Sequence, residues 1–370
     1  MKEHMNYTLL CDFYELTMGN GYFQTDGYAD QICYFDVFFR NVPDGGGFAI
    51  AAGLEQVIDY IENLRFTEED IAYLRGKGCF CEGFLDYLRT FRFTGDLWAV
   101  PEGTPIFPGE PIVTVRAPAI EAQFIETFLL LTLNHQSLIA TKTNRIVRAA
   151  DGRPVSEFGS RRAQGPDAAV LGARASYIAG CAGTACTLAD EMYGSPAGGT
   201  MAHSWVQMFP DEYTAFKTYC QLYPHSATLL VDTYNVLSPA CPTPSKRSRI
   251  FCSLRALPTA PSGWTAATSP ICPARPARCW MRRGLPSARS WPPLPGASTS
   301  SGICCFRGPR STPSAWVSGS SASKSEPVFG GVTSWPPWRT AGHIIPKIKI
   351  SATRIDHHPH FKKVYRPVRQ

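Results

Sequence analysis

Two adjacent arginines, Arg161 and Arg162, follow a short β-type run over residues 155–158 and are well suited to bind an anion. Each guanidinium presents a planar fork of N–H donors that matches phosphate or carboxylate. Adjacent arginines are also common on solvated surfaces, so that alternative stays open. The pattern indicates a candidate anion site at the carboxyl end of a strand.

A second loop, Gly198-Gly199-Thr200, leads to His203. A lone histidine more often has a structural role than a chemical one, and the spacing alone does not decide between the two. We therefore treat this loop and its histidine as a second candidate element of the same site.

The elements around these residues have an alternating order. Pro166 and Asp167 open a predicted helix that Gly180 can close, and a further helix over 211–223 precedes a buried strand over 227–231 that ends in Asp232. The predicted order is strand, helix, loop, helix, strand. A parallel (β/α) barrel and an open doubly wound sheet both place ligands at the carboxyl ends of such strands.

The first part of the chain predicts an α+β subdomain. Thr67 and Asp70 form a predicted capping box for a helix that Gly76 ends. The other expected elements are a helix over 12–22 that its glycines end, a strand over 31–40, helices over 53–64 and 84–91, short strands within 93–115, and a long helical pattern over 119–149 with a break near His135.

Composition narrows the class of protein. The 370 residues can bury a sizeable core. The first residues lack the pattern of a signal peptide, and the most apolar run, 128–133, is too short to span a membrane, so we expect a cytoplasmic protein without a membrane partner. Cys79 and Cys81 have no second pair at metal-like spacing, so the sequence predicts no protein-bound metal there.

The net charge of +6 does not predict a nucleic-acid partner, because the positive charge is confined to one segment. Residues 239–322 contain ten Arg, one Lys and no Asp or Glu, so they contribute +11 and the rest of the chain carries −5. A mildly acidic protein is thus interrupted by a basic segment.

Several runs of the sequence are long enough to indicate a family. They are TLLCDFYELTMGNGYF, NHQSLIATK, SEFGSRRAQGPDAA, GTMAHSWV and TLLVDTYN, followed by SKSEPVFGGV, IIPKIKIS and PHFKKVYR. Together these runs resemble nicotinate phosphoribosyltransferases of the prokaryotic type. The resemblance is almost continuous over residues 6–237 and is limited to islands afterwards. It implies an N-terminal α+β subdomain followed by an irregular (β/α) barrel of the type II phosphoribosyltransferase kind, incomplete in this chain.

The resemblance also implies an activity in NAD salvage. The family joins nicotinate to 5-phosphoribosyl pyrophosphate, with Mg²⁺ on the pyrophosphate, and releases pyrophosphate and nicotinate mononucleotide. ATP hydrolysis through a phosphohistidine drives the reaction, which gives a ligase-class enzyme. Its substrates are anionic, and this fits the paired arginines. A homodimer with sites shared between subunits is expected by resemblance.

Individual roles follow from the family motifs. Tyr14 and Thr200 fall at positions that contact nicotinate, and His203 falls at the phosphorylated histidine, for which a neutral imidazole is a competent nucleophile. Phe158 and Arg161 match positions that bind nicotinate and the phosphoribosyl group, and Asp232 matches a ribose or metal position.

The basic segment departs from the family and resembles a shifted reading frame. With permitted codons, residues 263–284 read two bases later give LDSGDLAYLSRQARKMLDEAG, which contains the family motif LDSGDL. The last residues, 367–370, resemble another shift followed by an early stop. We therefore expect residues 239–322 not to pack into the fold and the usual C-terminal segment to be missing.

These observations divide the chain into four parts. They are an N-terminal α+β subdomain (1–133), the first part of the barrel (134–238), the aberrant segment (239–322), and residual barrel and C-terminal fragments (323–370). The alternatives to a nicotinate enzyme are a nicotinamide or quinolinate phosphoribosyltransferase, or a non-catalytic protein whose basic segment binds anions.

Overall fold

The computed structural model describes most of the first 234 residues and short stretches after them. The described residues are 6–152, 154–223, 227–230, 233–234, 265–267, 315–317, 323, 325–334, 338–340 and 343–345. They belong to two compact units: residues 1–141 together with 326–370, and residues 142–325.

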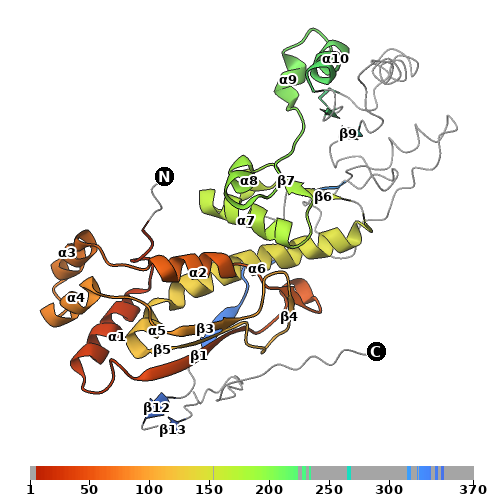
Figure 1. The fold of residues 1–370 in the computed structure, drawn as a ribbon. Coiled ribbons are helices and arrows are strands. Elements are labelled where there is room, and N and C mark those ends of the chain that lie inside the picture. The colour runs from red at the N-terminus through yellow and green to blue at the C-terminus, as the bar shows by residue number, and fades with distance from the viewer. Residues whose placement is uncertain are drawn as a thin grey trace. The chain divides into compact units, whose positions relative to one another are not determined.

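The first unit is built on an antiparallel sheet with the order β13-β12-β1-β5-β3, and β11 also pairs with β1. Its strands are β1 (Ile32–Phe39), β3 (Asp96–Ala99), β5 (Val113–Pro118), β11 (Gly331–Ser334), β12 (Trp338–Thr340) and β13 (His343–Ile345), beside a small pair of β2 (Ala49–Ile50) and β4 (Pro105–Ile106). Figure 1 shows β1, β3 and β5 in one layer.

Helices also contribute residues to the core of the first unit. They are α1 (Phe13–Gln24), α2 (Leu54–Asn63), α3 (Glu68–Gly76), α4 (Glu82–Arg89), α5 (Ala119–Phe124) and the first part of α6 (Glu126–Ala149), with a 3-10 turn η1 (Pro43–Gly45). The ring of Phe124 contacts those of Phe84 and Phe91, and all three belong to one buried apolar cluster that also includes Val37 and Val115 of the sheet. Burial of this apolar surface is the main stabilising term for the unit.

The predicted capping box is confirmed. The Thr67 hydroxyl accepts a hydrogen bond from the Asp70 N–H, and the Asp70 carboxylate accepts one from the Thr67 N–H. The predicted end of the first helix at its glycines is wrong, because α1 continues through Gly19 and Gly21 to Gln24. A Cβ atom at Gly19 would lie 3.1 Å from Phe124 Cζ. Glycine at this position permits close ring packing and does not end the helix.

The predicted break in the long helix lies at a different place. The chain leaves helical hydrogen bonding at Ile125, between α5 and α6, and α6 is continuous through His135. The Thr127 N–H in the first turn of α6 donates to the side chain of Glu15. A contact with a residue 112 positions away therefore supports the start of α6.

The second unit contains short parallel strands connected by helices. Its elements are β6 (Val155–Glu157), η2 (Ser160–Arg162), α7 (Pro166–Ile178), β7 (Gly183–Thr184), α8 (Thr187–Tyr193), α9 (His203–Gln207), α10 (Glu212–Leu222), β8 (Thr228–Leu230), β9 (Thr265–Ala267) and β10 (Ala315–Val317). The strand orders are β10-β6-β7 and β8-β9, all parallel. This is the mixed α/β, barrel-like pattern expected from the sequence.

Local details of this unit also agree with prediction. Pro166 begins α7, Gly180 adopts a positive φ of 104° after its end, and the Asp211 side chain caps α10. The order predicted for this region lacked the two-residue strand β7 and the helices α8 and α9. Of the aberrant segment the structure describes only β9 and β10, and these two strands pair with β8 and β6, contrary to the expectation at these residues. For the rest of residues 239–322 the expectation remains a prediction.

No helix among the described residues combines the length and the apolar character that crossing a membrane requires.

Candidate active site

The carboxyl end of β6 is held by a buried glutamate. Glu157 is inaccessible to solvent, and its carboxylate accepts hydrogen bonds from the Gly159 N–H and, at 2.9 Å, from the Thr184 hydroxyl. The same Thr184 hydroxyl accepts a bond of 3.0 Å from the Cys186 N–H. This network fixes the turns that follow β6 and β7.

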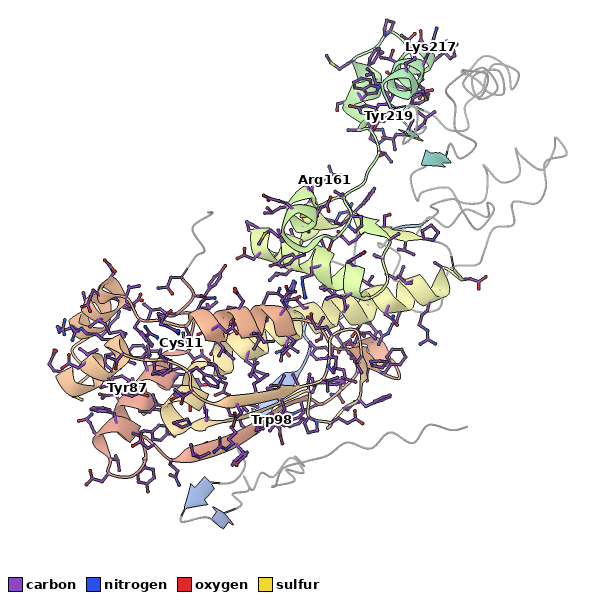
Figure 2. All side chains as sticks on the ribbon, in the orientation of Figure 1. Cys11, Tyr87, Trp98, Arg161, Lys217 and Tyr219 are labelled. Carbon is purple, nitrogen blue, oxygen red and sulfur yellow. The ribbon has the colours of Figure 1, made fainter. Side chains whose placement is uncertain are left out.

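Phe158 and Arg161 leave the sheet directly after this anchor. Phe158 is half-buried, while Arg161 is exposed in η2, the 3-10 turn closed by the Arg162 N–H at 2.7 Å from the Gly159 carbonyl (Figure 2). The guanidinium of Arg161 can therefore meet a ligand from solvent, as the sequence predicts for an anion site.

The loop that carries Thr200 leaves from the same edge of the sheet. Thr184 forms a parallel bridge to Ala197, and its carbonyl accepts a bond of 2.8 Å from the Gly198 N–H. Because Glu157 and Thr184 are paired in register, the residues after β6 and the Thr200 loop emerge side by side. The structure thus brings Phe158, Arg161 and the Thr200 loop to one edge.

His203 belongs to a neighbouring cluster of the same unit. It is the first residue of α9, and its Nδ1 lies 3.2 Å from the Thr233 hydroxyl, just beyond the end of β8. The cluster beneath it is apolar and consists of Met201, Val206, Ala215, Phe216, Cys220, Ala227 and Leu229. The predicted residue Asp232 is adjacent to Thr233 but lies outside the described residues.

Tyr14 belongs to the first unit. It lies in the first turn of α1 with 46% of its surface exposed. Partial burial, followed by the charges of Glu126, Glu15 and Asp12, raises the pKa of the Tyr14 hydroxyl to about 12. The phenol therefore remains a neutral hydrogen-bond donor at physiological pH.

Sequence reasoning missed Glu157 and Thr184, which organise the edge. The available signal was a charged residue inside an apolar β-type run, because a buried carboxylate needs hydrogen-bond donors. The sequence did not predict which residue bonds to Glu157, since Thr184 lies 27 residues further on in a two-residue strand.

We expect Thr184→Val to lower the free energy of unfolding by about 1–3 kcal/mol, because it leaves one oxygen of the buried Glu157 carboxylate without its hydroxyl donor. Urea denaturation measures the change. Thr187→Val, at an exposed position at the start of α8, is the matched control and should be neutral. Equal effects of the two substitutions would contradict the anchoring role of Thr184.

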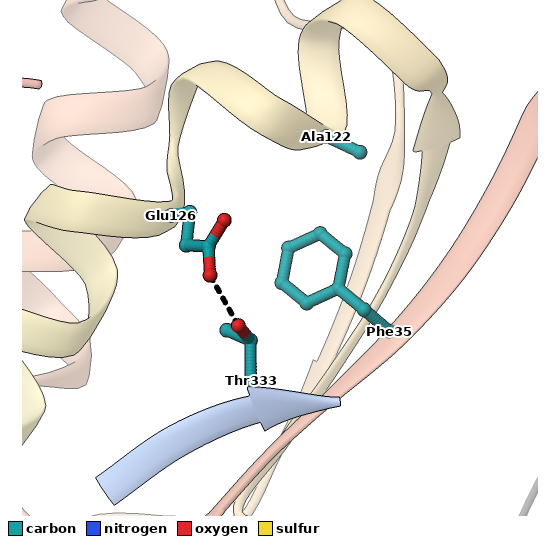
Figure 3. Close-up of a pocket in the computed structure, with 4 residues that line it drawn as sticks. All are labelled: Phe35, Ala122, Glu126 and Thr333. Atoms are coloured by element: carbon teal, nitrogen blue, oxygen red, sulfur yellow. Dashed lines mark hydrogen bonds between the residues drawn. The ribbon is translucent and has the colours of Figure 1, made fainter. Parts of the chain in front are cut away.

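Among the described residues, no group of three or more His, Cys, Asp or Glu side chains could hold a metal ion. A small hollow in the first unit is lined by Phe35, Ala122, Glu126 and Thr333 (Figure 3). It contains none of the predicted site residues.

Comparisons with known proteins show which families this chain is similar to. Residues 9–134 match the family model described as the nicotinate phosphoribosyltransferase (NAPRTase) N-terminal domain. Nicotinate phosphoribosyltransferase pncB2 of Mycobacterium tuberculosis is 49% identical over 237 residues, which are 64% of this chain and 50% of the relative. Nicotinate phosphoribosyltransferase of Bacillus subtilis is 42% identical over 244 residues, 66% of this chain and 49% of the relative.

Solved structures are similar as well. Human nicotinic acid phosphoribosyltransferase has a TM-score of 0.56 at 30% identity, covering 61% of this chain and 55% of the other. Nicotinate-nucleotide pyrophosphorylase of Pyrococcus furiosus has a TM-score of 0.51 at 23% identity, covering 69% and 65%, which indicates a shared fold.

The family model and these relatives show that the part of the chain they cover is similar to nicotinate phosphoribosyltransferases. The chain spans about half the length of the curated relatives it matches.

Proposed function

We propose that this chain is a nicotinate phosphoribosyltransferase of NAD salvage. It would form nicotinate mononucleotide and pyrophosphate from nicotinate and 5-phosphoribosyl pyrophosphate, coupled to ATP hydrolysis. The observation that carries the proposal is the shared edge of β6 and β7, where exposed Arg161 and half-buried Phe158 emerge beside the Thr200 loop.

The residue types at this edge suit the proposed substrates. Arg161 offers a planar fork of donors to the phosphoribosyl phosphate, and Phe158 offers an apolar ring to the pyridine. We assign Thr200 to nicotinate through its hydroxyl and Tyr14 to the pyridine ring. Fixed donors beside a group that develops charge lower the barrier mainly by positioning and electrostatic stabilisation.

We assign His203 to the ATP-coupled step. An imidazole nitrogen would attack the γ-phosphorus of ATP, a new N–P bond would form, and the bond to the ADP oxygen would break. The Thr233 hydroxyl at 3.2 Å from Nδ1 can orient the ring for this attack. Hydrolysis of the phosphohistidine by water would then release phosphate.

We propose Mg²⁺ as a companion of the phosphate substrates. Because the described residues hold no cluster of metal ligands, phosphate oxygens would supply most of its coordination. Asp232 is the protein oxygen donor that the family motif suggests, in the ribose or metal position. Bound Mg²⁺ would neutralise charge on the pyrophosphate leaving group.

The direct test is formation of nicotinate mononucleotide from nicotinate and 5-phosphoribosyl pyrophosphate, with Mg²⁺ and with or without ATP. Nicotinamide and quinolinate are the competing substrates, and we expect nicotinate to be preferred. A preference for either competitor, or anion binding without turnover both in this chain and in a version with the reading frame restored, would overturn the assignment.

We further propose that residues 239–322 result from a shifted reading frame. The test is to resequence the gene and to assay a second version in which the frame is restored through LDSGDL. Formation of the product by the restored version and its loss in the chain as given would support the proposal. An unshifted frame and full activity of the chain as given would contradict it.

Substituting His203 should separate the two chemical steps. We expect His203→Ala to abolish ATP hydrolysis and to lower product formation with ATP to the ATP-free rate, because the phosphoryl acceptor is lost. Labelling with γ-³²P-ATP and the two rate measurements check this. Ser204→Ala, at the adjacent exposed position, is the control and should retain the label.

We also propose a homodimer in the cytoplasm. Light scattering coupled to size-exclusion chromatography measures the oligomeric state, and a monomer at micromolar concentration would contradict the proposal.

A further inference from the structure

The starts of α1 and α6 meet at one buried carboxyl group. Glu15 is 0% exposed, and its Oε1 accepts hydrogen bonds from the Thr127 hydroxyl at 2.6 Å and from the Thr127 N–H at 3.2 Å. The Thr127 hydroxyl in turn accepts a bond of 3.2 Å from the Asp12 N–H. We call these three residues the Glu15–Thr127 junction.

The Glu15–Thr127 junction supplies α1 with a hydrogen bond at its N-terminus. Asp12 is the N-cap residue of α1, but its side chain makes no capping hydrogen bond. An uncapped first turn has free backbone donors and frays readily. The Thr127 hydroxyl accepts a hydrogen bond from the Asp12 N–H, so the first turn of α1 depends on α6 for its stability.

We propose that Glu15 is a positioning residue that fixes the direction of Tyr14 by joining the first turn of α1 to the start of α6. This inference rests on the proposed function, in which Tyr14 contacts nicotinate. Adjacent residues of an α-helix point about 100° apart, so fixing one of them fixes the direction of the other.

The second oxygen of Glu15 has a separate consequence. Oε2 is buried and accepts no hydrogen bond from the described residues. Burial is the main cause that raises the pKa of Glu15 to about 7, and Thr127 opposes the rise. A proton can therefore reside on Oε2 near neutral pH while Oε1 keeps both bonds to Thr127.

The groups around Glu15 add to this effect. The titratable groups that act electrostatically with Glu15 from the elements packed around it are Asp12, Cys11 and Tyr14 of the α1 region, Tyr60 of α2, and Glu126 of α6. Figure 3 shows that Glu126 itself accepts a hydrogen bond from Thr333 of β11. Every carboxylate among these groups disfavours a second negative charge nearby.

The charge on Glu15 should affect an anionic substrate at Tyr14. As the pH rises through about 7, Glu15 loses its proton and a negative charge appears next to the residue assigned to nicotinate. We expect the KM for nicotinate to rise over this range. Glu15→Gln keeps an oxygen acceptor for Thr127 but cannot ionise, so its KM should be independent of pH near 7.

A second substitution tests position without charge. Thr127→Val removes the hydroxyl that bonds both Glu15 and Asp12, so the first turn of α1 loses its support. We expect the KM for nicotinate to rise about tenfold at every pH while kcat changes less than twofold, because binding geometry is lost but the chemical step is retained.

The chain contains a matched control. Glu121 is also buried, and its carboxylate accepts bonds from the N–H of Thr94 at 2.5 Å and from the Thr94 hydroxyl at 2.9 Å. Glu121→Gln in α5 and Thr94→Val just before β3 make the same chemical changes away from the first turn of α1. They should leave the KM for nicotinate within twofold of the parent value.

A readout that does not need turnover completes the experiment. 3-Fluorotyrosine at position 14 should give a ¹⁹F signal that shifts with pH near 7 in the parent chain, stays constant in Glu15→Gln, and broadens in Thr127→Val. If neither the parent nor the version with the restored frame forms nicotinate mononucleotide, the proposed function fails, yet this signal still decides the positioning role. An unchanged ¹⁹F signal in both junction variants, or equal changes in the Glu121 and Thr94 controls, would overturn the inference.

Discussion

Replacing Phe329 with alanine should lower the free energy of unfolding of the first unit by about 3–5 kcal/mol. Phe329 is 2% exposed, and its ring is stacked on Phe39 of β1 with a centroid distance of 4.9 Å. Truncation removes buried apolar surface and leaves a cavity against the sheet. Urea denaturation followed by near-ultraviolet circular dichroism measures the loss.

The neighbouring residue provides the control for this prediction. Val328 is 70% exposed, so Val328→Ala should change stability by less than about 0.5 kcal/mol. If both substitutions were neutral, residues 326–334 would not belong to the core of the first unit. That outcome would also contradict the pairing of β11 with β1.

Replacing Arg161 with alanine should weaken binding of 5-phosphoribosyl pyrophosphate roughly 10- to 100-fold, because a charge-assisted hydrogen bond to phosphate is lost. We expect kcat/KM to fall about 10²- to 10³-fold if the same donor stabilises the transition state. Titration calorimetry measures the binding constant without turnover, and the product assay measures the rate.

Arg162 is the matched control for Arg161. Neighbouring residues of a 3-10 turn point about 120° apart, so one ligand does not meet both guanidiniums in the same way. Arg162→Ala should therefore weaken binding less than Arg161→Ala. A larger loss in Arg162→Ala would show that the sequence motif assigned the wrong arginine, and Arg161→Lys should be intermediate because it keeps the charge without the fork.

Local signals in the sequence predicted several helices and strands of the two units. Pro166 begins α7 and Gly180 follows its end, and Thr67 with Asp70 caps α3. Each of these residues acts on its own turn of helix. The β-type run before Gly159 was likewise predicted as a strand. Backbone geometry of this kind depends on a few adjacent residues, so a single sequence contains it.

Long-range contacts decided what the sequence could not predict. Gly19 was expected to end a helix, yet the rings of α4 and α5 make it a packing position. The start of α6 after Ile125 is supported by Glu15, and the edge of β6 depends on Thr184. In the first two cases a local pattern was overruled by a partner far away in the chain, as is common where tertiary packing outweighs propensity. In the third case the strand was predicted but its distant partner was not.

Partners far apart in the chain also limit how much of the candidate site can be predicted from the sequence. The motifs predicted which residue types gather at the carboxyl ends of strands, and the structure places Phe158, Arg161 and the Thr200 loop at one edge. His203 begins its own helix beside Thr233, a residue that no spacing rule connects to it. The support beneath a site, such as Glu157, is harder to predict than its exposed residues because its partners are tertiary.

The pairing of β11 with β1 also has a consequence for synthesis of the chain. Phe39 lies opposite Gly331, so about 290 residues must be translated before the outer edge of β1 finds this partner, which takes roughly 15–60 s at typical ribosome speeds. During that interval the nascent chain exposes unpaired strand N–H and C=O groups, which can pair with other chains. Yield from cells should therefore depend on chaperones that shield the nascent N-terminal unit until β11 emerges.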